Sequence, residues 1–302
     1  MVREIEVLAE EIRHTVIISD EPEALLAAKA AGRAVIGVEP CGAAEGEAEP
    51  GMTLAPAPGR IRPDIARDIV PGWEFATEEL AELVLRRHLG LPWTIGVTDR
   101  LVIRELTRAD AERVPQQEAL SAEEELFRDT EKLEVYIKGQ YGFYEYGTWA
   151  LVRKDDGAFV GLAGVSQPRL PAELAGILEE EAAMGAILAA TAPIERPSVE
   201  TIAQPPACPS DFLELGYRIF SPYRRQGYAL EACREILEYT HEVLGCRVCA
   251  MIRAENKASC RLAECLGMEQ LSMHTLTGTD SGSSQPLLLY GEIRSPQPGR
   301  ED

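Results

Sequence analysis

The pattern of apolar and polar residues predicts a chain built from two α/β parts. Near the N-terminus, an apolar run at 15–20 precedes alanines and leucines at helical spacing over 21–32, and a second apolar run follows at 33–38. Two strands joined by a helix in this way indicate a parallel βαβ unit. We expect Asp20 to cap the helix and Gly32 to end it in a left-handed conformation.

The next elements complete the first part of the chain. A loop rich in Gly, Ala, Glu and Pro occupies 39–62, and a short strand at 65–70 and a helix at 77–88 follow. A glycine and a proline shortly after the helix stop it. We therefore expect residues 1–92 to form a small βαβ domain of the three-layer type.

This first domain resembles the C-terminal half of a haloacid dehalogenase-like domain. The resemblance lies in the strand that ends at Asp20 and in the helix end Ala27-Ala-Lys-Ala-Ala-Gly32. The D-x-D-x-T/V loop that supplies the nucleophile in that family does not precede it, so we expect a degenerate domain without phosphatase chemistry. Asp20 then has two interpretations, a helix cap or a remnant of a metal-site carboxylate.

The pattern then changes to that of a second sheet with connecting helices. Strand-like alternation over 100–107 leads into a helical stretch that runs through the acidic residues 118–125. Asp-Gly between apolar runs at 148–153 and 158–165 predicts a β-hairpin, because glycine tolerates the positive φ of such turns. The proline-flanked segment 167–210, rich in Ala and Leu, is expected to be an insertion that carries a helix.

After the insertion, strands and helices alternate. We predict strands at 212–220, 247–253, 268–276 and 286–293, and helices at 229–244 and 257–266. Residues 98–295 are therefore assigned to a second α/β domain.

The charge balance excludes several classes of partner. The formal net charge is −20, from 30 Lys and Arg against 50 Asp and Glu, and a chain this acidic is not expected to bind nucleic acid or an anionic lipid surface. No apolar run is long enough to cross a membrane and the N-terminus is acidic, so we expect a cytoplasmic protein. Seven cysteines in such a chain fit reduced thiols. Cys246 and Cys249 form a C-x-x-C without a second ligand pair, so we expect no metal site.

The turn after the strand at 212–220 has the residues of an anion site. Arg224, Arg225, Gln226 and Gly227 lead directly into a predicted helix. Free amides at a helix start, with the positive end of the helix dipole, suit a pyrophosphate. Gly227 and a small alanine two residues later let the backbone approach it, and the arginines add charge-assisted bonds.

Two motifs in this domain resemble the GNAT N-acetyltransferase superfamily. Arg224-x-x-Gly227-x-Ala229 is similar to its acetyl-CoA loop, R/Q-x-x-G-x-G/A, and the run from Asn256 to Met268 is similar to its N-x-x-S-x-x-L-x-x-x-x-G-F segment. Glu214-Leu-Gly-Tyr-Arg-Ile219 looks like the RimJ/RimL-like branch, named for ribosomal-protein N-terminal acetyltransferases. The resemblance covers about residues 98–293, apart from the insertion.

The resemblance implies acetyl-CoA as a co-substrate and no metal. It also implies a mixed, mostly antiparallel sheet in which two central strands diverge at a bulge beside the cofactor. The implied cofactor-binding residues are Ile219 and Phe220, through their backbone amides, and Arg224, Arg225, Gln226, Gly227, Tyr228, Ala229, Asn256 and Ser259.

The resemblance also supplies catalytic candidates. Glu214 matches a carboxylate used in this branch, and we predict that it is the general base, acting through water; the alternative is that it faces solvent at the sheet's edge. Its apolar strand would raise its pKa. Ser259 and water are both candidates for protonating the departing thiolate. Two residues depart from the pattern, since Cys265 stands where lysine is common and Ala263 where tyrosine is frequent.

We therefore predict an acetyl-CoA-dependent N-acetyltransferase. It would move an acetyl group to a primary amine, on a protein N-terminus or a small molecule, by direct attack in a ternary complex. The alternative is a non-catalytic acyl-CoA-binding sensor or partner-binding protein. Tyr217, Tyr228 and the aromatic residues of 136–146 either line the amine pocket or belong to the core. The sequence leaves open the acceptor, the roles of the first domain and the insertion, and the oligomeric state.

Overall fold

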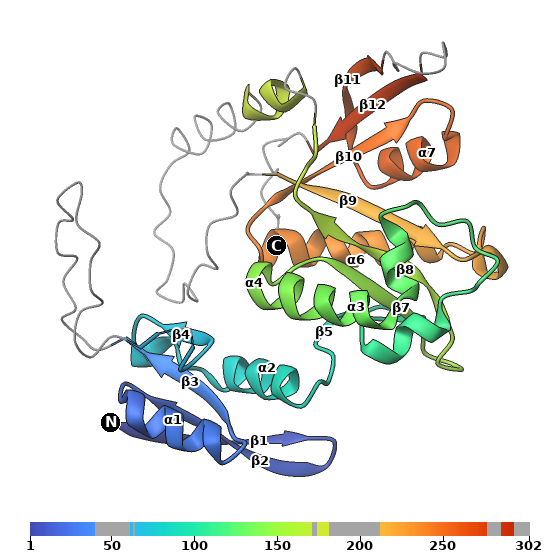
Figure 1. Ribbon diagram of the computed structural model, residues 1–302. Coiled ribbons are helices and arrows are strands. Elements are labelled where there is room, and N and C mark those ends of the chain that lie inside the picture. Colours follow the sequence, from blue (N-terminus) through green and yellow to red (C-terminus); the bar gives the residue numbers. More distant parts are fainter. Residues whose placement is uncertain (40–60, 63, 171–173, 181–211, 277–284, 293–302) are drawn as a thin grey trace, which may run out of the picture. The chain divides into compact units, whose positions relative to one another are not determined.

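The computed structural model describes residues 1–39, 61–62, 64–170, 174–180, 212–276 and 285–292. These residues divide into two compact units, Met1–Trp93 and the described residues from Thr94 onward (Figure 1). Each unit has its own sheet. The predicted loop at 39–62 falls almost entirely outside the described residues, as does most of the predicted insertion.

The first unit is a four-stranded sheet with a helix on each face. Strands β1 (Val2–Ala9), β2 (Ile12–Ser19), β3 (Ala34–Val38) and β4 (Asp68–Val70) follow one another in sheet order, with helices α1 (Pro22–Ala30) and α2 (Glu78–His88) and a short 3-10 helix at Trp73–Phe75. The pairs β2–β3 and β3–β4 are parallel and β1–β2 is antiparallel.

Two apolar clusters hold these three layers together. One joins β1, β2 and β3 to the Ala81, Val84 and Leu85 side of α2. The other joins Leu25 of α1 to Ile61 and the chain that follows it. The predicted parallel βαβ unit of the three-layer type is therefore confirmed, although the edge strand β1 was not predicted.

The start of α1 differs from the sequence-based expectation. The residue at the helix cap is Glu21, and no side chain caps the helix there. The Ser19 hydroxyl accepts the Glu21 N–H at 3.0 Å, and the Asp20 carboxylate pairs with the N-terminal amine instead. The prediction that Asp20 caps the helix is wrong, whereas Gly32 does have the expected left-handed φ of +72°. The haloacid dehalogenase-like resemblance stays a prediction.

The second unit contains an eight-stranded mixed sheet in the part of the chain that the structure describes. Its order is β11 (Glu269–Leu276), β12 (Gln285–Gly291), β10 (Arg247–Arg253), β9 (Phe212–Ile219), β8 (Phe159–Ser166), β7 (Thr148–Arg153), β6 (Leu101–Arg104) and β5 (Thr94–Val97). Only β9 and β10 pair in parallel within it, so the predicted mixed, mostly antiparallel sheet is confirmed.

Helices cover both faces of this sheet (Figure 1). The elements are 3-10 helices at Arg108–Arg113, Glu124–Arg128 and Ser221–Tyr223, a π-helix at Ile137–Tyr141, and α3 (Thr130–Tyr136), α4 (Gly142–Tyr144), α6 (Tyr228–Glu242) and α7 (Lys257–Cys265). Residues 174–180 are also helical, and Leu174 and Leu178 pack on Phe212. Side chains alternate along β9, so Phe212 faces this helix while Tyr217 faces α7.

The pairing between β9 and β10 ends after only three residue pairs. Phe212, Leu213 and Glu214 are paired with residues 247–249, and beyond them the two strands separate. β9 stays paired with β8 in unbroken register, while β10 continues with β12. The strands therefore diverge as predicted, but no bulge interrupts the register of β9 with β8. Beyond Cys249, β10 is paired only on its other edge, with β12.

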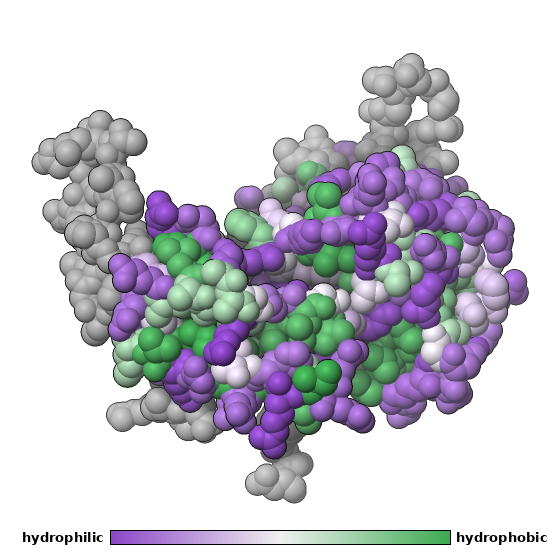
Figure 2. All heavy atoms as spheres, turned by 60° about the horizontal axis from the view of Figure 1, so that its bottom comes forward, coloured by the Kyte–Doolittle hydropathy of each residue, from purple (hydrophilic) through white to green (hydrophobic). Residues whose placement is uncertain are grey.

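The surface reflects the acidic composition. Hydrophilic residues cover most of the face shown in Figure 2, and smaller apolar areas lie between them. Among the described residues, no helix has the length and apolar content needed to span a membrane.

Replacing Ile36 by alanine should lower the free energy of unfolding of the first unit by about 2–5 kcal/mol, because a fully buried side chain on β3 would leave a cavity. Leu8 is 64% exposed on β1 of the same sheet, and Leu8→Ala is the matched control, with an expected effect within about 0.5 kcal/mol. Urea denaturation followed by circular dichroism measures both. Equal losses in the two variants would contradict the assigned core.

Candidate active site

An open cavity of about 330 Å³, the crevice, lies between β9 and β10 where the strands diverge, and residues of α7 line another side of it. From β9 it is lined by Glu214, Leu215, Gly216 and Tyr217, from β10 by residues 250–253, and from α7 and its flanks by Asn256, Ser259, Leu262, Ala263, Leu266 and Met268. The fold thus brings three predicted site residues, Glu214, Asn256 and Ser259, around one space.

Glu214 lies at the last paired position, where the crevice begins. Its carboxylate accepts a hydrogen bond from the Arg169 N–H at 3.4 Å, and the Met251 N–H of β10 also bonds it. Burial raises the pKa of this carboxyl, and the two amides and the charge of Arg169 offset only part of the effect. Glu214 is thus a half-buried carboxylate on a central strand, not an exposed one at the sheet's edge.

The backbone of β9 offers polar groups to the same crevice. In an antiparallel ladder, alternate residues direct their N–H and C=O groups to the same neighbour. The Phe220 N–H donates to Val160 O at 2.9 Å on the β8 side, so the N–H groups of Tyr217 and Ile219 point away from β8, toward the side of β10. Tyr217 lines the cavity there. The expectation that Phe220 offers a free amide is therefore wrong, because that amide is used within the sheet.

Tyr217 and Ser259 meet across the cavity. The Tyr217 hydroxyl donates to Ser259 Oγ at 2.8 Å. Asn256 caps α7, since its Oδ1 accepts the Ser259 N–H at 3.2 Å, and this bond fixes the start of the helix. Burial raises the pKa of Tyr217, although its contact with Ser259 acts in the opposite direction.

The predicted anion-binding turn forms a second group, at the start of α6. Gly227 precedes the helix with a φ of +87°, and Arg225 also has a positive φ of 58°. A Cβ at Gly227 would lie 3.2 Å from Arg100 Nη2, so the position is both conformationally and sterically restricted. The first amides of the helix, at Tyr228 and Ala229, have no partner in a preceding turn.

Arg100, which the sequence did not single out, packs against this helix start. Its guanidinium donates to Gln226 O at 2.9 Å and to Glu231 at 2.7 Å, and it stacks on the Tyr228 ring at 4.5 Å. Tyr228 is buried beneath it. Arg100 therefore adds positive charge to the turn, but Glu231 already balances much of it.

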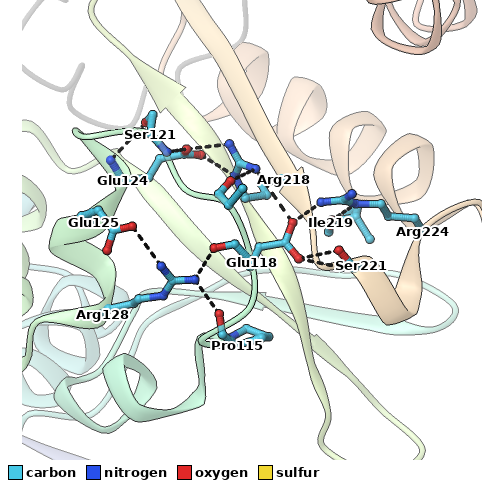
Figure 3. Close-up of polar contacts among 11 residues, drawn as sticks. Pro115, Glu118, Ser121, Glu124, Glu125, Arg128, Arg218, Ile219, Ser221 and Arg224 are labelled. Carbon is cyan, nitrogen blue, oxygen red and sulfur yellow. Dashed lines mark hydrogen bonds and ion pairs between the residues drawn. The ribbon is translucent and has the colours of Figure 1, made fainter.

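Arg224 is held by the protein itself (Figure 3). Its Nε donates to Ile219 O at 2.9 Å, and its guanidinium pairs with the buried carboxylate of Glu118. The Gln226 side chain likewise donates to Pro222 O at 3.0 Å. Arg224 and Gln226 therefore shape the turn, although both residues are exposed, as is Arg225.

Glu118 is the central acceptor of the network in Figure 3. Besides Arg224, it accepts hydrogen bonds from the Ser221 N–H and hydroxyl, both at 2.8 Å. Burial alone would raise its pKa, but these bonds and the charges of Arg224 and Arg218 lower it. Glu118 belongs to the acidic run 118–125, and the pattern of that run did not indicate that Glu118 is buried while most of its acidic neighbours are not.

A second ion pair in Figure 3 holds the same segment against β9. The Arg218 guanidinium donates to both Glu124 oxygens, at 2.7 and 2.6 Å, and to Ala119 O at 2.9 Å. The face of β9 that carries Glu214 is thus flanked by residues 115–128. Gly216 lies between Glu214 and Arg218 on this face, and a Cβ there would meet no atom within 4 Å.

The remaining sequence-based candidates lie elsewhere. Tyr141 and Tyr146 are buried and Phe143 is exposed, and none of the three lines the cavity. The five described cysteines are thiols that form no disulfide among the described residues, and Cys246 and Cys249 are both buried. Within the described ranges, no cluster of three or more His, Cys, Asp or Glu side chains is arranged to hold a metal ion.

Comparison with known proteins identifies one family. A family model described as an acetyltransferase (GNAT) domain matches residues 100–269. That range contains β9, β10, α6 and α7, and so both groups of site residues. No curated protein matches the sequence.

Solved structures of acetyltransferases are similar to this chain at low identity. A GNAT-family acetyltransferase from Bacillus anthracis is 16% identical, with a TM-score of 0.42, over 65% of this chain and 96% of that one. The ribosomal-protein-S5-alanine acetyltransferase from Vibrio fischeri is 12% identical, with a TM-score of 0.44, over 68% and 98% of the two chains.

Glu118→Gln should lower the free energy of unfolding by about 2 kcal/mol at neutral pH, because Ser221 and Arg224 lose a charged acceptor. The folded-state pKa of Glu118 lies below its ordinary value of 4.5, so its contribution is complete above that value and is lost as the pH falls through the lower folded-state pKa. Denaturation at a series of pH values should therefore show the gap between wild type and variant closing in acid. Glu112→Gln, at an exposed position shortly before this segment, is the control. A gap that does not depend on pH argues against the ion-pair network.

Proposed function

Because this chain belongs to the GNAT acetyltransferase family, and is therefore an acetyltransferase enzyme, we propose that it moves the acetyl group of acetyl-CoA to a primary amine within a ternary complex. The two groups of site residues have distinct tasks in this proposal. The crevice takes the pantetheine arm and the thioester, and the start of α6 takes the diphosphate.

The observation that carries the proposal is that β9 and β10 stop pairing beside the cavity, so part of each facing strand edge has no strand partner. Buried backbone N–H and C=O groups require hydrogen-bond partners. On β9, the N–H groups of Tyr217 and Ile219 and the C=O group of Tyr217 point away from β8, whereas Ile219 O already accepts from Arg224. The pairing of β10 with β9 has ended by residue 250. Pantetheine is a chain of amides and methylenes, so it can bond these edges much as an added strand would.

The diphosphate fits the start of α6. The amides of Tyr228 and Ala229 and the helix dipole supply an anion site, and Gly227 leaves room for close approach. Arg225 adds an exposed cation to the turn. Arg224 acts indirectly, since its bonds to Glu118 and Ile219 O hold the turn in shape.

Acyl transfer then needs a base and a stabilised oxyanion. We assign the base to Glu214, which takes a proton from the attacking amine through water. The amine nitrogen bonds to the thioester carbonyl carbon, the C–S bond breaks, and its electron pair goes to sulfur. The Ile219 N–H, which faces the crevice, is the donor for the carbonyl oxygen.

The open space above Gly216 is the approach for the acceptor. It lies on the face of β9 that carries Glu214, beside the carboxylates of the 115–128 segment. The sequence resemblance to the RimJ/RimL-like branch makes protein N-termini the first acceptor class to test, with small primary amines as the second.

Wild-type protein should release free thiol from acetyl-CoA only when an amine or N-terminal peptide is present. In Glu214→Gln, kcat/KM should fall by about 10²–10⁴-fold, as for loss of a general base. Because the pKa of Glu214 is raised, the acid limb of the wild-type profile of kcat/KM against pH should lie above the ordinary carboxyl range, and the variant should lose it.

Glu238→Gln, an exposed change on α6, is the control and should leave the rate unchanged. Amine-dependent thiol release that is equal in wild type and Glu214→Gln would remove Glu214 from the proposed role. Saturable binding of acetyl-CoA without turnover on any amine would support the acyl-CoA sensor instead.

Gly227→Glu should abolish binding of CoA, because it adds strain, a side chain and a negative charge where the diphosphate is proposed to lie. Gly245→Glu is matched in strain, since Gly245 has a φ of +65° and lies beyond the other end of α6. This control should keep the wild-type affinity. Isothermal titration calorimetry with CoA measures both, and equal affinities in the two variants would refute the assigned diphosphate site.

A further inference from the structure

The Tyr217–Ser259 hydrogen bond joins two elements that meet only through folding. Tyr217 lies on β9 and Ser259 in the first turn of α7, and both side chains line the cavity between the diverging strands. Their hydroxyl oxygens are 2.8 Å apart. The contact thus belongs to the cavity wall and not to the surface.

Both partners are fixed independently of each other. Tyr217 is paired with Ala163 in the unbroken β8–β9 register. Ser259 is fixed by the cap of α7, where its N–H donates to Asn256 Oδ1 at 3.2 Å. A serine in the first turn of a helix often bonds its own backbone, but here its oxygen accepts from a tyrosine on another element.

This arrangement decides where the serine proton points. A serine hydroxyl has one proton and two acceptor lone pairs. A phenol is a stronger hydrogen-bond donor and a weaker acceptor than an aliphatic hydroxyl, and Tyr217 is the donor in this 2.8 Å contact. Ser259 Oγ is therefore the acceptor, which leaves the serine proton for another group and polarises that O–H bond.

Apart from Ser259, the part of α7 that lines the cavity has few hydrogen-bond donors for a sulfur atom. Ala263 lies one turn beyond Ser259 on the same wall and presents a buried methyl group. In the proposed reaction, the C–S bond breaks and its electron pair makes the sulfur negative. A donor aimed at that atom stabilises the charge until water protonates the thiolate.

We propose that Tyr217 is a positioning residue that aims the Ser259 hydroxyl at the sulfur of the acyl donor. The inference rests on the proposed function, because the sulfur occupies this cavity only if acetyl-CoA binds there. Tyr217 does not touch the reacting atoms in this assignment. Its effect passes through Ser259.

The test is a double-mutant cycle of Tyr217→Phe and Ser259→Ala with acetyl-CoA and an accepted amine. Each single variant should lower kcat by about tenfold and keep KM for acetyl-CoA within about twofold, because the bond matters when sulfur becomes charged. The double variant should be no slower than Ser259→Ala alone, since Tyr217 acts only through that serine. Tyr239→Phe, a conservative change on α6, is the matched control with unchanged kcat.

The outcomes separate this inference from the proposed function. If wild type shows no amine-dependent thiol release, the proposed function fails and this inference fails with it. If wild type turns over and Tyr217→Phe has the wild-type kcat, the inference alone is overturned. Losses that multiply in the double variant would also overturn it, because Tyr217 would then act independently of Ser259. Thermal unfolding of each variant identifies loss of fold as a separate cause.

Discussion

The three residue pairs that join β9 to β10 are the constraint on which the second unit depends. With more pairs, the sheet would be continuous and its backbone groups satisfied; with none, the two halves of the sheet would separate. Phe212, Leu213 and Glu214 supply the junction, and their partners at 247–249 are mostly buried. The cavity between the strands follows directly from the point at which this pairing stops.

Acidic residues stabilise the loop that leads into α6, despite the large negative charge of the chain. Glu118 holds Ser221 and Arg224, and Glu231 holds Arg100. The ion pairs join Arg224 and Arg100 to carboxylates distant in sequence, and the bonds to Ser221 fix the same loop. Arg100 and Arg224 are therefore largely neutralised, so an anion bound at the start of the helix must depend chiefly on backbone amides, the helix dipole and Arg225.

The local sequence pattern predicted the strands and helices that carry the site better than it predicted the contacts between the site residues. The predicted strand at 247–253 coincides with β10, because its apolar run is local. The sequence analysis assigned the Phe220 amide to the cofactor, but this amide bonds to β8. Along a strand, successive amides point to opposite neighbours, and only the pairing with β8 shows toward which neighbour each amide points. Glu118 and Arg224 are 106 residues apart, and nothing in the local pattern of either residue indicates their contact.

Side chains alternate along β9, so the proposed base, Glu214, and the Tyr217–Ser259 pair lie on opposite faces of the sheet. Glu214 and Tyr217 are three positions apart, and an odd separation along a strand puts side chains on opposite sides. Glu214 then lies with the acceptor approach at Gly216, while Tyr217 reaches Ser259 on the side of α7. In the proposed reaction, the crevice between β9 and β10 lets Glu214 and Ser259 both reach the thioester, while the backbone of β9 lies between them.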